Sequence, residues 1–147
     1  MGMIVNKWAR SEYTITDTWV AGVALTGAEV KSLREGRGSL REGFAKIING
    51  ELYLVGADIP RYSHYSGKEY DAKRSRKLLL KRSEMLKIQK QIEGKNLTLV
   101  PLKLFFKGRW AKCEVGLAKG KREWEKRADL KARDIKRDLD KAVKNTV

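Results

Sequence analysis

The dipeptide Asn49-Gly50 stands at the junction of two apolar stretches, residues 43–50 and 51–59. Asn-Gly in such a place is the strongest short-range signal for a β-hairpin, because both residues accept the positive φ that a two-residue turn needs. Pro60 follows and is expected to end the second strand, since proline has no N–H to donate to a neighbouring strand. The middle of the chain is therefore predicted to form an antiparallel pair of strands.

Four further stretches have the composition and alternation of β-strands. They are residues 12–16, 19–25, 98–106 and 111–117. In the third stretch every second residue from Thr98 to Phe106 is expected on one face, and Pro101 indicates an edge or a bulge. In the fourth, Cys113 points inward as a core residue and Lys112 points outward.

Two helices are predicted between these strands. The first begins at the capping box formed by Thr26 and Glu29 and ends at Gly36. The second begins with Ser83 as N-cap and ends at Gly94. Six strands, short turns and no alternation of strands with crossover helices predict a mainly β domain, a closed or nearly closed antiparallel barrel over residues 1–119.

Positive charge is concentrated in two regions of the chain. The sequence has 33 Lys and Arg against 18 Asp and Glu, a formal net charge of +15. Residues 61–95 hold eleven bases and four acids, and residues 119–147 hold eleven bases and six acids, whereas the first sixty residues hold seven of each. This clustering predicts an anionic partner, with nucleic acid as the first interpretation and a membrane surface as the second.

The densest basic cluster is residues 73–77, which lie in a stretch, 61–77, that is interpreted as a basic loop. Its two arginines, Arg74 and Arg76, are of the residue type that grips phosphate oxygens with paired hydrogen bonds. The leucines at 78–80 are interpreted either as core residues or, for one of them, as a contact for an unstacked base or ribose. Tyrosines among the charges are available to stack on bases.

Motifs for catalysis are scarce. One His (His64) and one Cys exclude a zinc site and an internal disulfide, and no phosphate-binding loop is present. A metal-dependent nuclease would need convergent carboxylates such as Glu29 and Asp58, but Glu29 is better explained as a helix cap. We expect no enzymatic activity, no cofactor and no metal. Among binding functions, a barrel that binds single-stranded nucleic acid in general is kept as the alternative to a barrel that binds one specific RNA.

The cellular location is predicted from the distribution of apolar residues. No apolar run approaches the roughly 18 residues of a membrane span, and residues 1–10 lack the core of a signal peptide. A cytoplasmic protein with no membrane partner is expected.

Residues 120–147 are predicted to form a basic tail. Residues 123–142 contain no helix breaker, but their apolar stripe is narrow and mostly Ala. An isolated helix of this length is marginal in water. The tail is therefore expected to be helical only when a partner holds it.

The sequence resembles the SsrA-binding protein (SmpB) family, whose members bind transfer-messenger RNA in bacterial ribosome rescue. The resemblance covers about residues 6–140 and rests on several specific strings in the same order. They are residues 6–10 (NKWAR), 21–22 (AG), 25–34 (LTGAEVKSLR), 49–51 (NGE), 74–80 (RSRKLLL), 101–102 (PL), 116–121 (GLAKGK) and 126–127 (KR).

The resemblance implies a six-stranded antiparallel barrel like the oligonucleotide-binding fold, with two or three peripheral helices and a flexible basic tail. It implies binding to the tRNA-like domain of transfer-messenger RNA, and a tail that enters the decoding centre and messenger channel of the small ribosomal subunit. Elongation factor Tu would be an indirect partner. The residues expected to contact the RNA are Asn6, Lys7, Arg10, Lys73, Arg74, Arg76, Lys77, Leu79 and Lys112.

The tail residues expected to contact ribosomal RNA are Lys119, Gly120, Lys121, Arg122, Trp124, Lys126, Arg127, Lys131, Arg133, Lys136 and Arg137. Three departures from the family pattern are visible, one of them in the tail, where the family's Asp-Lys-Arg is Glu125-Lys126-Arg127. The family usually has Glu before the Ala-Gly pair, where this chain has Val20, so one hydrogen-bond acceptor for RNA is missing. The Asp-Pro before the basic cluster is Asp71-Ala72 here, which predicts a less rigid loop.

Overall fold

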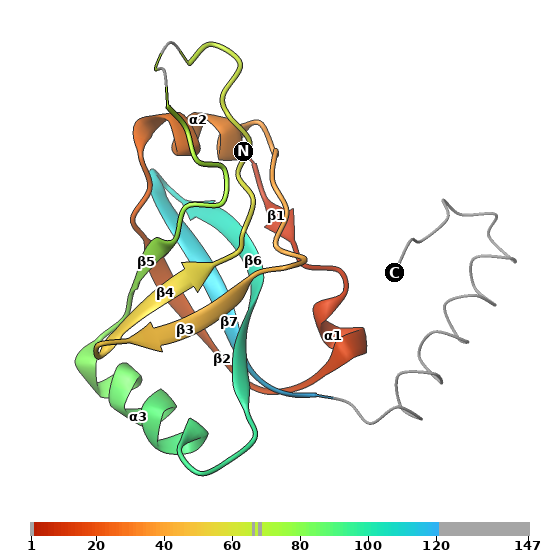
Figure 1. Cartoon of the computed structure of the whole chain (residues 1–147), viewed down its shortest axis with the longest axis vertical. Coiled ribbons are helices and arrows are strands. Elements are labelled where there is room, and N and C mark those ends of the chain that lie inside the picture. Colours follow the sequence, from red (N-terminus) through yellow and green to blue (C-terminus); the bar gives the residue numbers. More distant parts are fainter. Residues whose placement is uncertain (1, 66, 68, 121–147) are drawn as a thin grey trace, which may run out of the picture.

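The computed structural model describes residues 2–65, 67 and 69–120. Helices and strands follow one another along the chain as labelled in Figure 1. In order they are β1 (Ile4–Val5), α1 (Ala9–Glu12), β2 (Tyr13–Val23), α2 (Gly27–Arg34), β3 (Phe44–Ile48), β4 (Glu51–Val55), β5 (Arg76–Leu79), α3 (Arg82–Ile92), β6 (Thr98–Lys107) and β7 (Trp110–Gly120).

Six of the strands in the described part of the chain form a closed antiparallel ring. The order around the ring is β6-β3-β4-β5-β2-β7, and the pairing of β7 with β6 closes it. The short strand β1 lies outside the ring and pairs with β6. The predicted fold class, a six-stranded antiparallel barrel with peripheral helices, is confirmed.

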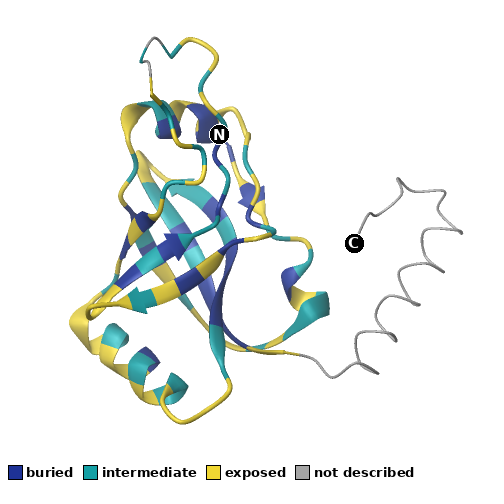
Figure 2. Ribbon diagram, in the orientation of Figure 1, coloured by how far each residue is buried: buried dark blue, intermediate teal, exposed yellow. Residues whose placement is uncertain are grey.

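The helices α2 and α3 lie beyond opposite ends of the barrel (Figure 1). Each contributes one fully buried side chain, Leu33 from α2 and Ile88 from α3, to the cluster that fills the barrel. Along β3 and β4 in Figure 2, buried positions alternate with less buried ones. This is the period of two that a strand shows when one face packs on a core and the other faces water.

Several local predictions are confirmed. The Thr26 hydroxyl accepts from the Glu29 N–H (3.3 Å), and the Glu29 carboxylate accepts from the Thr26 N–H (2.9 Å), which is the predicted capping box. Asn49 and Gly50 have φ of 53° and 77° and join β3 to β4. The hairpin and the start of α2 are therefore determined by short-range chemistry that the sequence displays.

Other boundaries were predicted wrongly. In place of two strands at 12–16 and 19–25 there is one continuous strand, β2 (Tyr13–Val23), with a bulge between Ile15 and Asp17. The strand after Asn49-Gly50 ends at Val55, because Gly56 has a φ of 81° and turns the chain. The helix α3 begins at Arg82, one residue before the predicted cap Ser83, and the Lys81 N–H donates to the Glu84 carboxylate instead.

Strand β6 shows why a bulge matters for burial. The prediction placed alternate residues from Thr98 to Phe106 on one face, but the register shifts between Pro101 and Lys103. As a result Leu99 and Leu104 pack in the main core, while Val100 and Leu102 pack with Ala9 of α1 in a second cluster. The bulge at Pro101 was predicted correctly. The switch of faces that the bulge causes was not predicted.

Candidate nucleic-acid interface

The strand register brings two predicted RNA contacts to the two sides of one glycine. Gly22 of β2 pairs with Leu79 of β5 and, on its other edge, with Lys112 of β7. The Leu79 side chain is 53% exposed, and Lys112 is half-buried and faces outward, as alternation predicted. Because glycine has no side chain, the surface between Leu79 and Lys112 stays low, and both can reach the same ligand.

These residues line a groove of about 470 Å³, open to solvent, between the outer surface of β2, β5 and β7 and the start of α2. We call it the Gly22 groove; Gly22, Leu79, Arg109, Trp110 and Lys112 are among its lining residues. Trp110 is 65% exposed, the largest exposed fraction of any large apolar side chain in the described residues. The Arg109 guanidinium lies 5.5 Å from the centre of the Trp110 ring.

Arg109 and Trp110 were not among the predicted contacts. A signal for Trp110 was present, since strand alternation places it outward on the same side as Lys112, next to a turn. An exposed tryptophan beside cations is a suitable platform for a nucleobase, because every base has a flat face that can stack.

The same outer surface continues across β6. Lys112 pairs with Phe105, and Glu114 pairs with Lys103, which in turn pairs with Val5 of β1. The Lys103 ammonium lies 5.1 Å from the centre of the Phe105 ring. Cations thus lie beside aromatic or apolar side chains across neighbouring strands, with the Glu114 carboxylate as an acid among them. Cations next to aromatic side chains are typical of surfaces that bind single-stranded or unstacked nucleic acid.

Val20 also lies on this surface and is 50% exposed. Its partner on β7 is Glu114, whose side chain is half-buried and faces outward beside Lys112. A carboxylate therefore stands on the strand next to Val20, directly opposite the position at which an acceptor was expected to be missing.

The prediction that Arg76 grips RNA is wrong. Its side chain is fully buried, and its Nε and Nη2 donate to Oε2 of Glu29 at 2.9 and 2.6 Å. Further donations go to the carbonyls of Ala57 (2.9 Å) and Ala72 (3.0 Å), so Arg76 ties β5 to the loop that precedes it. The sequence shows a basic cluster but does not show which of its members has a buried acid for a partner.

Arg74 shares the same carboxylate but stays partly accessible. Its Nη2 donates to Glu29 Oε1 at 2.6 Å, and 42% of its side chain is exposed. Burial alone would raise the pKa of Glu29, but hydrogen bonds from Arg74, the Thr26 backbone and Arg76 outweigh it and hold that pKa below its ordinary value. Glu29 is therefore a charged helix cap whose single carboxylate is also the shared counter-ion of two arginines.

The remaining predicted contacts lie in separate places. Lys77 is exposed on the same face of β5 as Leu79, and its ammonium is 3.1 Å from the Glu51 carboxylate. Lys73 lies in the loop before β5 and forms an exposed ion pair with Glu42 at 3.6 Å. Of the predicted set, the structure brings Leu79 and Lys112 into one groove, and Lys77 lines the neighbouring groove that Leu79 shares.

Asn6, Lys7 and Arg10 come from the segment of β1 and α1 that runs along β6 (Figure 1). The Asn6 amide donates to the carbonyls of Pro101 (3.0 Å) and Leu40 (3.3 Å), and its oxygen accepts from the Trp8 N–H. Lys7 and Arg10 are exposed beside it. Asn6 thus positions the backbone that presents these two cations. The predicted tail contacts after Gly120 lie outside the described residues, and β7 itself runs through Lys119 and Gly120.

The alternative of a nuclease finds no support in this geometry. Both carboxylate oxygens of Glu29 are occupied by arginines and by the helix cap. Within the described ranges, no three His, Cys, Asp or Glu side chains are placed to hold a metal ion. Burial raises the pKa of the Cys113 thiol to about 12, so it stays protonated in the core. None of the helices in the described part has the length and apolar composition that crossing a membrane requires.

Comparison with known proteins gives one consistent relationship. The chain matches the family model described as SmpB protein over residues 3–145. A protein from Nocardioides sp. named SsrA-binding protein is 51% identical over 138 residues, which are 94% of this chain and 87% of the relative. A protein of the same name from Gloeobacter violaceus is 44% identical over 142 residues, 97% of this chain and 93% of the relative.

The fold is also found in a solved structure described as "tmRNA-SmpB: a journey to the center of the bacterial ribosome". The TM-score is 0.70 and the sequence identity 44%, over 84% of this chain and 87% of that chain.

Proposed function

Because this chain belongs to the SmpB family, we propose that it binds the tRNA-like domain of transfer-messenger RNA and promotes rescue of stalled ribosomes by trans-translation. Support comes from the relatives named SsrA-binding protein and from the solved structure whose description joins SmpB, transfer-messenger RNA and the ribosome. We place the protein in the cytoplasm, since a protein that rescues stalled ribosomes acts where the ribosomes are.

The observation that carries the proposal is the position of Leu79 and Lys112 on either side of Gly22, in one groove with Trp110. Lys112 would meet a phosphate, Leu79 would pack on a ribose or an unstacked base, and Trp110 would stack on a base. Lys77, and the exposed cations Lys7 and Arg10, would add contacts to the RNA backbone, as would Lys73 and Arg74.

The test is the affinity for transfer-messenger RNA of Leu79→Ala and Lys112→Ala against Lys46→Ala. Lys46 is an exposed lysine of β3, a strand that borders neither β2 nor β7. We expect a loss of about tenfold for each groove variant, which corresponds to roughly 1.4 kcal/mol, and little change for Lys46→Ala. Equal affinities for all three variants would contradict the assignment of the groove.

A competition experiment separates this function from general single-strand binding. Under the proposal, the folded tRNA-like domain displaces a labelled unstructured oligonucleotide at much lower concentration than an unlabelled copy of that oligonucleotide does. Equal displacement would favour the general binder, whose stacking contacts tolerate any sequence.

The tail is proposed to act on the ribosome and not in holding the free RNA. Its side chains would contact small-subunit ribosomal RNA in the decoding centre and messenger channel. The residues concerned are Lys119, Gly120, Lys121, Arg122, Trp124, Lys126, Arg127, Lys131, Arg133, Lys136 and Arg137. Elongation factor Tu would take part indirectly, through the shared RNA. Deleting residues 120–147 should abolish rescue while most RNA affinity remains; equal loss of both would contradict this division.

A further inference from the structure

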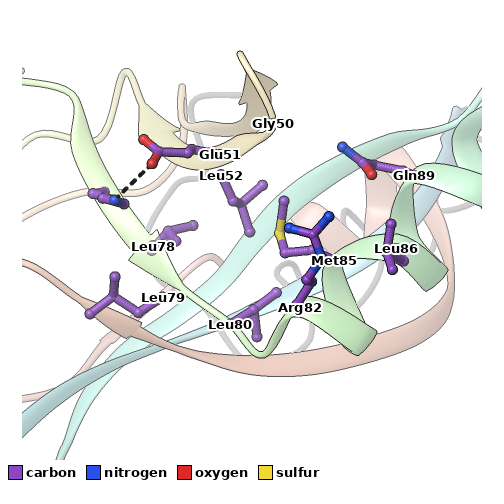
Figure 3. A pocket seen from close by; sticks show the side chains of 11 residues that line it. Gly50, Glu51, Leu52, Leu78, Leu79, Leu80, Arg82, Met85, Leu86 and Gln89 are labelled. Atoms are coloured by element: carbon purple, nitrogen blue, oxygen red, sulfur yellow. Dashed lines mark hydrogen bonds and ion pairs between the residues drawn. The ribbon is translucent and has the colours of Figure 1, made fainter.

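A second groove lies on the other side of Leu79, between β4, β5 and α3 (Figure 3). Its volume is about 380 Å³, within the range of roughly 300–1,000 Å³ that small-ligand sites occupy. We call it the α3 groove; its lining includes Leu52, Leu79, Leu80, Arg82, Met85 and Gln89. Leu79 lines both this groove and the Gly22 groove, so the two are contiguous over one side chain.

The floor of the α3 groove is apolar and its upper edges are open. Leu52 is buried beneath it, and Leu80 and Met85 are partly buried along its sides. Leu79 and Leu86 are each 53% exposed, one on β5 and one on α3. Two half-exposed leucines that face a shared hollow leave apolar surface in water, and a flat apolar ligand between them would cover it.

Two of the four polar side chains in its lining have no partner among the residues that the structure describes. No hydrogen bond or ion pair within the described residues involves the guanidinium of Arg82 or the side-chain amide of Gln89, and both project from α3 (Figure 3). Lys77 is held by Glu51 at 3.1 Å (dashed line in Figure 3). Residues 81–95 carry five bases against two acids. The groove therefore combines an apolar floor with polar edges, where the Glu51 carboxylate is paired with Lys77 and the Arg82 guanidinium is left as the unpaired charge among the described lining residues.

We propose that the α3 groove receives one unpaired nucleobase of the RNA whose backbone crosses the Gly22 groove, an inference that rests on the proposed function. The base would lie against Met85 and between the two exposed leucines, because a nucleobase has apolar faces and a polar edge. The Gln89 amide would bond that edge, and the Arg82 guanidinium would bind the neighbouring phosphate. An apolar peptide would cover the leucines but leave Arg82 without an anion, so the charge favours RNA.

The first experiment measures affinity for transfer-messenger RNA with two variants of α3 that change charge equally. Leu86→Glu places a carboxylate at the edge of the groove, and Lys90→Gln removes one cation from an exposed position of α3 that is not part of the groove lining. Both substitutions are on the surface and lower the net charge by one. We expect Leu86→Glu to weaken binding by roughly tenfold, as loss of one stacked base does, and Lys90→Gln by less than threefold.

The second experiment locates the nucleotide. Cys113 is the only cysteine of the chain and is buried, so Gln89→Cys introduces a single reactive thiol for a short photo-crosslinker. The proposal predicts a crosslink to one unpaired nucleotide of transfer-messenger RNA, and much weaker crosslinking from Lys90→Cys. Crosslinks spread over many nucleotides, or equal from both thiols, would overturn it.

Outcomes for the groove and for the proposed function are distinguishable. If Leu79→Ala and Lys112→Ala weaken RNA binding while Leu86→Glu does not, the α3 groove is not a base site and the proposed function stands. If none of the three weakens binding, the assignment of the Gly22 groove fails as well, and the proposed function itself fails if the wild type does not prefer transfer-messenger RNA to an unstructured oligonucleotide. If Leu86→Glu leaves binding of free RNA unchanged but weakens binding to the ribosome, the occupant of the groove is another molecule and the proposal is wrong.

Discussion

Among the ion pairs of this barrel, those of the buried Glu29 carboxylate should contribute most to the free energy of unfolding. Glu29→Gln keeps the shape of the side chain but removes the charge that faces Arg74 and Arg76. Arg76 has no exposed surface and would keep only uncharged acceptors, namely the carbonyls of Ala57 and Ala72 and the amide oxygen of the substituted side chain. A buried charge that loses its counter-ion costs about 3–5 kcal/mol.

That loss is large against the total stability of a domain, roughly 5–15 kcal/mol. Urea unfolding followed by circular dichroism should show a lower free energy of unfolding for Glu29→Gln, with an unchanged dependence on urea concentration. The matched control is Glu51→Gln, which breaks the exposed ion pair with Lys77 and should leave the unfolding midpoint unchanged. A free energy for Glu29→Gln within about 1 kcal/mol of wild type, or equal effects of both substitutions, would refute the argument from burial.

Other expectations follow from the same contacts. The pKa of Glu29 is lower in the folded than in the unfolded protein. The charge of Glu29 therefore stabilises the fold fully above the unfolded-state pKa of about 4.3, and this stabilisation is lost as pH falls through the lower folded-state pKa. Wild type should consequently lose more stability on acidification than Glu29→Gln. Glu114→Gln should weaken binding of the folded tRNA-like domain, because the charged acceptor beside Val20 is replaced by a weaker, neutral one. It should strengthen binding of an unstructured oligonucleotide, because a repelling charge is lost. Trp110→Ala should lower RNA affinity about tenfold, by a factor that is largely independent of salt concentration. Lys112→Ala should make the slope of log affinity against log salt concentration shallower by about 0.7–0.9, because one phosphate contact is lost. Parallel salt dependences for the two variants would contradict the separation of stacking from charge.

Local chemistry explains which parts of the fold were predictable. The capping box of Thr26 and Glu29 and the Asn49-Gly50 turn involve residues at most three positions apart, and both were predicted correctly. The strand β5 was missed because only four residues form it, inside a stretch whose charges are typical of a loop. Its pairing with β2 joins residues more than fifty positions apart, which local propensity does not reveal.

The same limit applies to the candidate interface. Alternation alone placed Lys112 on the outside of the barrel, but only the register shows that Leu79 stands across Gly22 from it. Arg76 was misjudged because its partner, Glu29, is 47 positions away, and a basic cluster in sequence resembles a phosphate-binding cluster whether or not a buried acid neutralises part of it. Residues were therefore well assigned where their role depended on the local pattern and poorly where it depended on distant partners.

Nucleotide-resolution footprinting of transfer-messenger RNA with wild type, Leu79→Ala and Lys112→Ala is the most direct test of a shared binding groove around Gly22. Each variant should lose protection at the same or adjacent nucleotides of the tRNA-like domain, because the two side chains flank one glycine. Loss of protection on separate arms of the RNA, or full protection retained by both variants, would show that these residues do not form one interface.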